Sequence, residues 1–118
     1  MIRSDGKFVR DYIYVKDVVE AYLTVGAAAC RKGVAGEAFN FSVESKVTVR
    51  QIVDRICAIM GKPSMKPRVL NAARAEIRDQ ALSAAKARRV LGWKPRWTLD
   101  RGLRETAAWY ERYFKARP

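Results

Sequence analysis

The chain contains no histidine, and this absence excludes several kinds of active site. Imidazole is a frequent zinc ligand and the general base of Ser-His-Asp and Cys-His nucleophile systems, so neither chemistry is available. Cysteine is scarce as well: only Cys30 and Cys57 are present, without CxxC spacing. We predict that both are reduced thiols buried in apolar helical patterns. No metal site is expected.

Glycine is missing from the places where a nucleotide cofactor would need it. All seven glycines are isolated along the chain, and no Gly-rich turn between a strand and a helix is present to hold a dinucleotide pyrophosphate. We therefore predict no cofactor site in these 118 residues. Oxidation or reduction by this chain alone is not expected.

Long hydrophobic runs are also absent. No apolar run approaches the roughly 20 residues that span a membrane, and the opening MIRSDGKF lacks the apolar centre of a signal peptide. We therefore predict a cytoplasmic protein. With 49% hydrophobic and 31% charged residues, the composition is that of a globular chain, and we expect a single domain over residues 1–118.

Positive charge is abundant, with 24 Lys and Arg against 12 Asp and Glu and a net charge of +12. Such a balance suits a polyanion, and a small basic nucleic-acid-binding module is one interpretation. However, the basic residues are spread from Arg3 to Arg117, with no finger, basic arm or RNP-like aromatic motif. A solvated basic surface or a small phosphorylated ligand is therefore the preferred interpretation, and nucleic acid is the alternative.

Hydrophobic periodicity and turn signals predict a mixed α/β fold. Thr48 and Gln51 form the pattern of a capping box, Asp17 suits a helix N-terminus, and Gly92 suits a helix C-terminus. The tryptophans Trp93, Trp97 and Trp109 are expected in the core, with base stacking as the alternative. We expect strands over residues 8–15, 37–43 and 66–70, and helices over residues 17–33, 48–60 and 83–92, capped by Ser83 in the last case, with a final helix after Thr98. This order predicts a few short strands covered by about four helices.

The stretch VRDYIYVKDV holds Tyr12 and Lys16 in the spacing Tyr-x-x-x-Lys. A catalytic dyad of this kind needs both residues on one face of a helix, where the lysine lowers the pKa of the tyrosine. In a strand the same spacing would separate them by about 13 Å. Because the intervening residues favour a strand, we interpret the match as a coincidence and predict no catalytic residue.

Arginine is the informative residue type. Arg10, inside a predicted strand, offers a planar fork suited to phosphate oxygens; the alternative is a surface pair with Asp11. The polar segment 71–82 lacks periodicity and is a candidate ligand loop. It carries Arg74 and Arg78 among acidic residues, which is also typical of a solvated segment. Two arginine-bearing segments could close on a diphosphate from two sides.

Three segments together resemble a known family. SDGKFVRDYIYVKDVVEAYL, FNFS and EIRDQALSAAKARRVLGWKPRWTLDRGLRETAAWY are similar, in this order and across almost the whole chain, to the C-terminal third of an extended short-chain dehydrogenase/reductase (SDR). The nucleotide-sugar epimerases and 4,6-dehydratases belong to this group, and the CDP-glucose 4,6-dehydratase type looks nearest. The resemblance implies that Arg10 contacts the pyrophosphate of a nucleoside-diphosphate sugar and that Tyr12 lies near the same site. It implies a second arginine, for which Arg74 is preferred over Arg78.

The resemblance also implies what lies elsewhere. The dinucleotide-binding Rossmann domain and the true Tyr-x-x-x-Lys dyad of the family precede the part that this chain matches. We therefore expect a substrate-binding fragment of an NAD(P)-dependent lyase or isomerase of carbohydrate metabolism, inactive alone, with NAD(P) bound only in the full-length protein. The helix over residues 18–29 would pack against the missing domain. Exposed apolar surface there predicts a homodimer or aggregation.

Overall fold

The structure is a computed structural model that describes residues 1–116. Within these residues it contains a two-stranded sheet and four helices, which confirms the predicted mixed α/β fold of few short strands and about four helices. The elements are β1 (Val9–Asp11), α1 (Val15–Ala28), β2 (Lys46–Thr48), α2 (Val49–Ile59), α3 (Ala85–Leu91) and α4 (Leu99–Lys115). β1 and β2 are antiparallel, with Arg10 opposite Val47.

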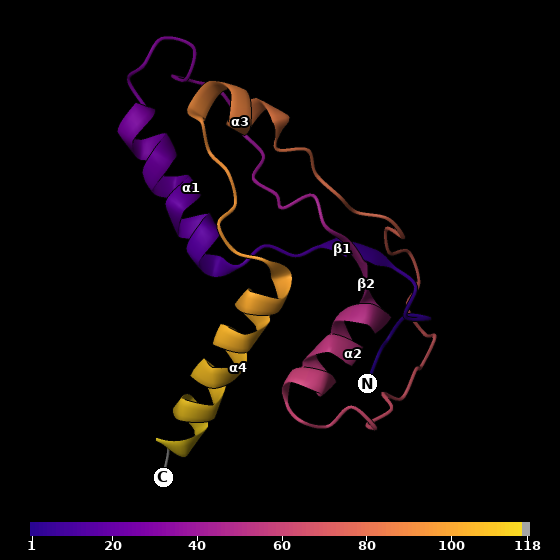
Figure 1. Cartoon of the computed structure of the whole chain (residues 1–118). Helices are drawn as coiled ribbons and strands as arrows, with labels where there is room; N and C mark the ends of the chain where they lie inside the picture. Colours follow the sequence, from indigo (N-terminus) through magenta and orange to yellow (C-terminus); the bar gives the residue numbers. More distant parts are fainter. Residues whose placement is uncertain (117–118) are drawn as a thin grey trace.

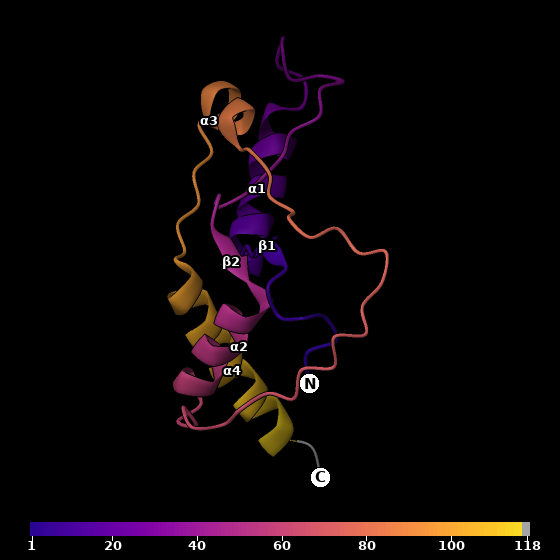
Figure 2. The ribbon, with the colours of Figure 1, turned by 90° about the vertical axis from the view of Figure 1, so that its right-hand side faces the viewer.

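The helices form two pairs. α1 packs beside α3 and α2 beside α4, and Figure 1 shows these pairs at opposite ends of the molecule with the sheet near α2. The turned view of Figure 2 shows the connection between α2 and α3 as a long outer loop. The radius of gyration is 17.3 Å, whereas a compact domain of this length has about 13 to 14 Å. The chain is therefore open and elongated.

Local signals account for the helix ends. The Thr48 hydroxyl accepts a hydrogen bond from the Gln51 N–H at 3.1 Å, and the Gln51 side chain accepts one from the Thr48 N–H at 2.8 Å, so the predicted capping box at α2 is confirmed. Thr98 caps α4 by accepting from the Arg101 N–H at 3.3 Å. α3 ends at Gly92, which adopts the left-handed conformation with φ 69° that glycine adopts without strain.

The strand predictions were only partly right. The predicted strand over residues 8–15 shortens to β1. The predicted strand over 37–43 is wrong, because within residues 1–116 no strand lies beside this segment to complete a ladder. The second strand is instead β2. Residues 66–70 form no strand either; Val69 makes a single bridge to Ile2.

Two helix boundaries also differ from the prediction. α1 begins at Val15, two residues earlier than expected. It also ends earlier than expected, at Ala28, because the chain turns through residues 29–36. α3 is capped at Ala84 rather than at Ser83. The Ser83 hydroxyl does accept from the Ala85 N–H at 3.3 Å, so the predicted side chain lies at the helix start but one position too early.

The buried core is small. Within residues 1–116, its one contiguous cluster consists of Ala21, Ala84, Ala87 and Trp93, with Ile13, Phe39, Phe41 and Leu91 packed against it. Ile2, Val34, Val47 and Ile52 are buried outside this cluster. Core packing is confirmed for Trp93, whereas Trp97 is half-buried and Trp109 is exposed. The prediction of buried thiols was wrong: Cys30 is exposed and Cys57 is half-buried, and neither forms a disulfide.

The outer face of α1 is apolar and open to solvent. Val15, Val19, Tyr22 and Leu23 are all more than half exposed, and burial of such surface favours association. We predict that light scattering gives an apparent mass that rises with protein concentration. Leu23→Glu should lower it, whereas Ala35→Glu, an equal charge in an exposed turn outside this face, should not. A monomer at every concentration would contradict the prediction.

Candidate functional site

Arg10 lies on β1 with its guanidinium against the loop of residues 71–80. Its Nη1 donates to the Val9 carbonyl at 2.8 Å and to the Arg78 carbonyl at 3.3 Å, and its Nη2 lies 3.7 Å from a Glu76 carboxylate oxygen. The side chain is 24% exposed. Arg10 is therefore oriented by its surroundings and still reaches solvent.

The loop is fastened to the N-terminal segment by backbone hydrogen bonds. The Val9 N–H donates to the Arg78 carbonyl at 2.8 Å, and the Gln80 N–H donates to the Val9 carbonyl at 3.1 Å. At the other end of the loop, the Ala72 and Ala73 N–H groups donate to the Arg3 carbonyl at 2.8 and 3.1 Å. The segment that the sequence marks as a ligand loop thus runs directly beside the arginine that the sequence marks as a phosphate contact.

The two loop arginines differ in position. The backbone of Arg78 contacts Arg10, whereas Arg74 follows the residues that are bonded to Arg3. Both are exposed, and within residues 1–116 the side chain of neither forms an ion pair or hydrogen bond. Both guanidinium groups are therefore available to an anion, and the preference for Arg74 stays a prediction.

Asp11 faces away from Arg10, as alternation along a strand requires. Its Oδ2 accepts from the hydroxyl of buried Ser42 and, at 3.4 Å, from the Leu82 N–H. Its Oδ1 is buried and has no hydrogen-bond partner within the part of the chain that the structure describes. The alternative of a local Arg10–Asp11 pair is therefore not what forms. Asp11 instead joins β1 to two distant segments, a role that sequence reasoning missed.

Tyr12 and Lys16 lie just after β1 and in the first turn of α1, respectively. Burial raises the pKa of Tyr12, and the nearby Arg10 charge only partly opposes this, so the phenol stays protonated near neutral pH. Lys16 lies in the first turn of α1, 3.5 Å from the Glu105 carboxylate and 4.8 Å from the centre of the Trp97 ring. Within residues 1–116 no hydrogen bond joins the two side chains, and the interpretation of the match as a coincidence stays a prediction.

Glu44 holds the start of α3 near this region, and the sequence showed no signal for it. Its carboxylate accepts from the Ala84 N–H at 2.9 Å and from Arg88 at 3.0 Å. The Arg88 hydrogen bond, followed by the Ala84 N–H, lowers the pKa of the Glu44 carboxyl. A helix N-terminus stabilises a carboxylate in the same way. Glu44 therefore keeps α3 close to the end of the loop of residues 71–80.

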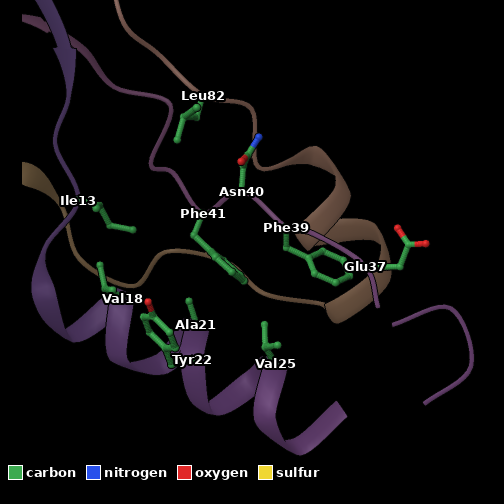
Figure 3. A pocket seen from close by; sticks show the side chains of 10 residues that line it. All are labelled: Ile13, Val18, Ala21, Tyr22, Val25, Glu37, Phe39, Asn40, Phe41 and Leu82. Atoms are coloured by element: carbon green, nitrogen blue, oxygen red, sulfur yellow. The ribbon is translucent and has the colours of Figure 1, made fainter. Parts of the chain in front are cut away.

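A separate cavity of about 430 Å³ opens between α1 and residues 37–41. Figure 3 shows Phe41 and the α1 side chains Val18 and Ala21 on facing sides of it, with Asn40 near Leu82. Its lining is mostly apolar, and none of the arginines discussed above contributes to it. The cavity is therefore distinct from the site around Arg10 and the loop of residues 71–80. Only that site carries the positive charge that suits a phosphate.

The residues present do not fit a dinucleotide or a metal ion. Within residues 1–116 the sheet is a single antiparallel pair, without the parallel strand and Gly-rich turn that hold a pyrophosphate. The same residues contain no cluster of His, Cys, Asp and Glu that could bind a metal. None of their helices combines the length and apolar character that crossing a bilayer requires.

Solved structures define the class of protein to which this fold belongs. The UDP-glucose 4-epimerase of Thermotoga maritima, solved with UDP-glucose, is similar over 96% of this chain and 35% of its own, with 34% identity and a TM-score of 0.84. The dTDP-glucose 4,6-dehydratase of Bacillus anthracis, solved with NAD, is similar over 98% of this chain and 35% of its own, with 29% identity and a TM-score of 0.80. The fold is that of the extended SDR nucleotide-sugar dehydratases and epimerases.

Within that class the family is defined by a model described as GDP-mannose 4,6 dehydratase, which matches residues 2–106. The chain belongs to this family, and the predicted resemblance is confirmed. The dTDP-glucose 4,6-dehydratase of Xanthomonas campestris pv. campestris is 34% identical over 118 residues, covering 92% of this chain and 32% of the relative. The chain thus spans about a third of the length of its relatives. The predicted closeness to the CDP-glucose 4,6-dehydratase type stays a prediction.

Proposed function

We propose that this chain is the nucleotide-sugar-binding, C-terminal part of an NAD(P)-dependent nucleotide-sugar 4,6-dehydratase or epimerase. The observation that carries the proposal is the placement of Arg10, partly buried on β1 and directed by the Arg78 carbonyl of the adjacent loop. A guanidinium held in this way is suited to the oxygens of a diphosphate. Membership of a family of nucleotide-sugar enzymes supports the same ligand class.

The surroundings of Arg10 supply further contacts for such a ligand. Tyr12, whose raised pKa keeps its hydroxyl protonated, can donate a hydrogen bond to a phosphate or sugar oxygen. Arg78 and Arg74 on the adjacent loop are exposed, and their guanidinium groups can add contacts to an anion. We propose these four residues, Arg10, Tyr12, Arg74 and Arg78, as the substrate-binding set.

The chain alone is proposed to be catalytically incomplete. NAD(P) would supply the hydride chemistry in the whole enzyme, but the described residues do not fit a dinucleotide site. Binding of the cofactor and the proton transfers at the sugar would therefore depend on a Rossmann domain outside the part matched here. We propose that the isolated chain binds nucleoside-diphosphate sugars without converting them.

Calorimetric titration with CDP-, UDP-, dTDP- and GDP-sugars tests this function. Arg10→Ala should weaken binding about 10- to 100-fold, because a hydrogen bond to a charged group is worth about 1.5–3 kcal/mol. Arg55→Ala is the matched control, since Arg55 is an exposed arginine on α2 that pairs with Asp100 of α4 at 3.0 Å and is not part of the proposed site. Equal losses in the two variants would contradict the site.

The same titrations separate the alternative function, a small basic nucleic-acid-binding module. Binding of a polyanion weakens steeply with salt in proportion to the number of phosphates contacted. A sugar nucleotide contacts the protein through one base and one diphosphate, so its affinity should depend less on salt and more on the base. A steep salt dependence with no preference among nucleotides would favour the nucleic-acid module and overturn our proposal.

A further inference from the structure

Glu76 lies between two arginines of the proposed site. One carboxylate oxygen is 3.8 Å from Nη2 of Arg3, and the other is 3.7 Å from Nη2 of Arg10. Arg3 belongs to the N-terminal segment, Arg10 to β1 and Glu76 to the loop, so one acidic side chain connects three parts of the chain. A carboxylate that faces two guanidinium groups offers them the same kind of anionic acceptor oxygens that a phosphate offers.

The loop is built so that Glu76 can leave. Ala72 and Ala73 are bonded to Arg3 on one side, and Arg78 and Gln80 are bonded to Val9 on the other. Residues 74–77 make no backbone hydrogen bonds within residues 1–116. The Glu76 side chain is 38% exposed. Movement of this short span between its two bonded ends would therefore break none of the backbone contacts that position Arg10.

We propose that Glu76 is an internal counter-anion that the diphosphate of the ligand displaces, and that Arg3 then becomes an additional phosphate contact. This inference rests on the proposed function and adds a residue, Arg3, that the sequence did not indicate. The side chain of Arg3 is 80% exposed, so it is free to turn toward a ligand. The diphosphate replaces a single carboxylate charge with a larger one that both guanidinium groups can bind in a forked geometry.

Competition between the Glu76 carboxylate and a diphosphate for Arg3 and Arg10 should be measurable. Exposed ion pairs at these distances are individually weak, so removing the carboxylate should tighten anion binding about three- to tenfold rather than by orders of magnitude. The difference should shrink as salt rises, because screening weakens exposed charge pairs. Arg3→Gln should weaken binding of a diphosphate, and should do so in the Glu76→Gln background as well.

The experiment titrates the full 118-residue chain with inorganic pyrophosphate and with UDP, comparing wild type and Glu76→Gln. Glu105→Gln is the matched control, because it removes the same charge from an exposed ion pair, with Lys16 at 3.5 Å, outside the site. Far-ultraviolet circular dichroism confirms that each variant is folded. We expect tighter binding of both probes in Glu76→Gln alone.

Each outcome has a separate meaning. Glu76→Gln binding no tighter than Glu105→Gln, while nucleotide sugars still depend on Arg10, overturns the counter-anion and leaves the proposed function in place. Weaker UDP binding with unchanged pyrophosphate binding in Glu76→Gln also overturns it, since Glu76 would then contact the nucleoside. Tighter pyrophosphate binding without any preference for nucleotide sugars supports the counter-anion and overturns the function.

Discussion

Asp17→Asn is expected to destabilise the chain by about 3 kcal/mol, because the native carboxylate is buried and accepts two backbone hydrogen bonds. Asp17 is 1% exposed. Its Oδ1 accepts from the Arg96 N–H at 2.9 Å and its Oδ2 from the Trp97 N–H at 3.1 Å. An asparagine amide has one acceptor oxygen and would direct an NH₂ group at a backbone N–H, leaving two donors without acceptors. Urea unfolding of the two proteins, followed by circular dichroism, measures the difference.

Asp100→Asn is the control for this prediction. Asp100 also lies in the first turn of a helix, α4, but its side chain is 63% exposed and makes one ion pair, with Arg55. Its replacement should cost less than about 1 kcal/mol. If the two variants unfold at the same urea concentration, the helix N-terminus rather than the buried hydrogen bonds explains the role of Asp17.

Asp17 also illustrates what could be predicted from the sequence. Its place in the first turn of a helix follows from local pattern, as do the Thr48 and Thr98 caps and the end of α3 at Gly92, since each depends on residues within one helical turn. The hydrogen bonds from Asp17 to residues 96 and 97 do not follow, because they join segments about 80 positions apart. Local chemistry defined the helices, and contacts distant in sequence arranged them.

The prediction of a strand over residues 37–43 failed for the same reason. Residues 37–43 have the composition of a strand, but a strand exists only where a second one pairs with it. No strand lies beside these residues within the described chain, and the short β2 pairs with β1 instead. The preference of the segment for an extended form is visible in the sequence, whereas its partner is not.

The candidate site was predictable by residue type and not by contact. Arg10 stood out as a planar cation in a strand, and segment 71–82 as a polar loop, and the structure places them side by side. The sequence offered Asp11, the next residue, as an alternative partner of Arg10. The observed partner is Glu76, because adjacent residues of a strand face opposite ways and the loop returns to the same side.

Trp93→Ala is expected to cost about 3–5 kcal/mol, the range for truncating a large buried aromatic side chain. Trp93 is 4% exposed and is the largest member of a buried cluster that otherwise consists of Ala21, Ala84 and Ala87. Its ring meets that of Phe41 edge to face with centroids 5.0 Å apart. The other buried members of this cluster are alanines, whose side chains are too short to fill the space left by the indole. The cavity should therefore persist. Urea unfolding measures the loss.

Trp93→Phe separates packing from hydrogen bonding at the same position. The Trp93 indole N–H is buried and has no hydrogen-bond partner within residues 1–116, and an unpaired buried donor costs about 1–3 kcal/mol. Phenylalanine removes that donor, which is stabilising, and has a smaller ring, which loses packing. The two contributions should nearly cancel, so the free energy of unfolding should change by less than about 1 kcal/mol. A loss as large as that of Trp93→Ala would show instead that the indole N–H is bonded in solution.

Trp93 should also affect the site around Arg10, because its ring packs on Phe41 and Ser42 follows Phe41 in the sequence. The Ser42 hydroxyl donates to Asp11, and Asp11 adjoins Arg10 on β1. Loosening of Phe41 should therefore weaken nucleotide-sugar binding in Trp93→Ala under conditions where the variant is still folded, whereas Trp93→Phe should bind as the wild type does. Unchanged binding in folded Trp93→Ala would mean that β1 and the loop hold Arg10 without help from the core.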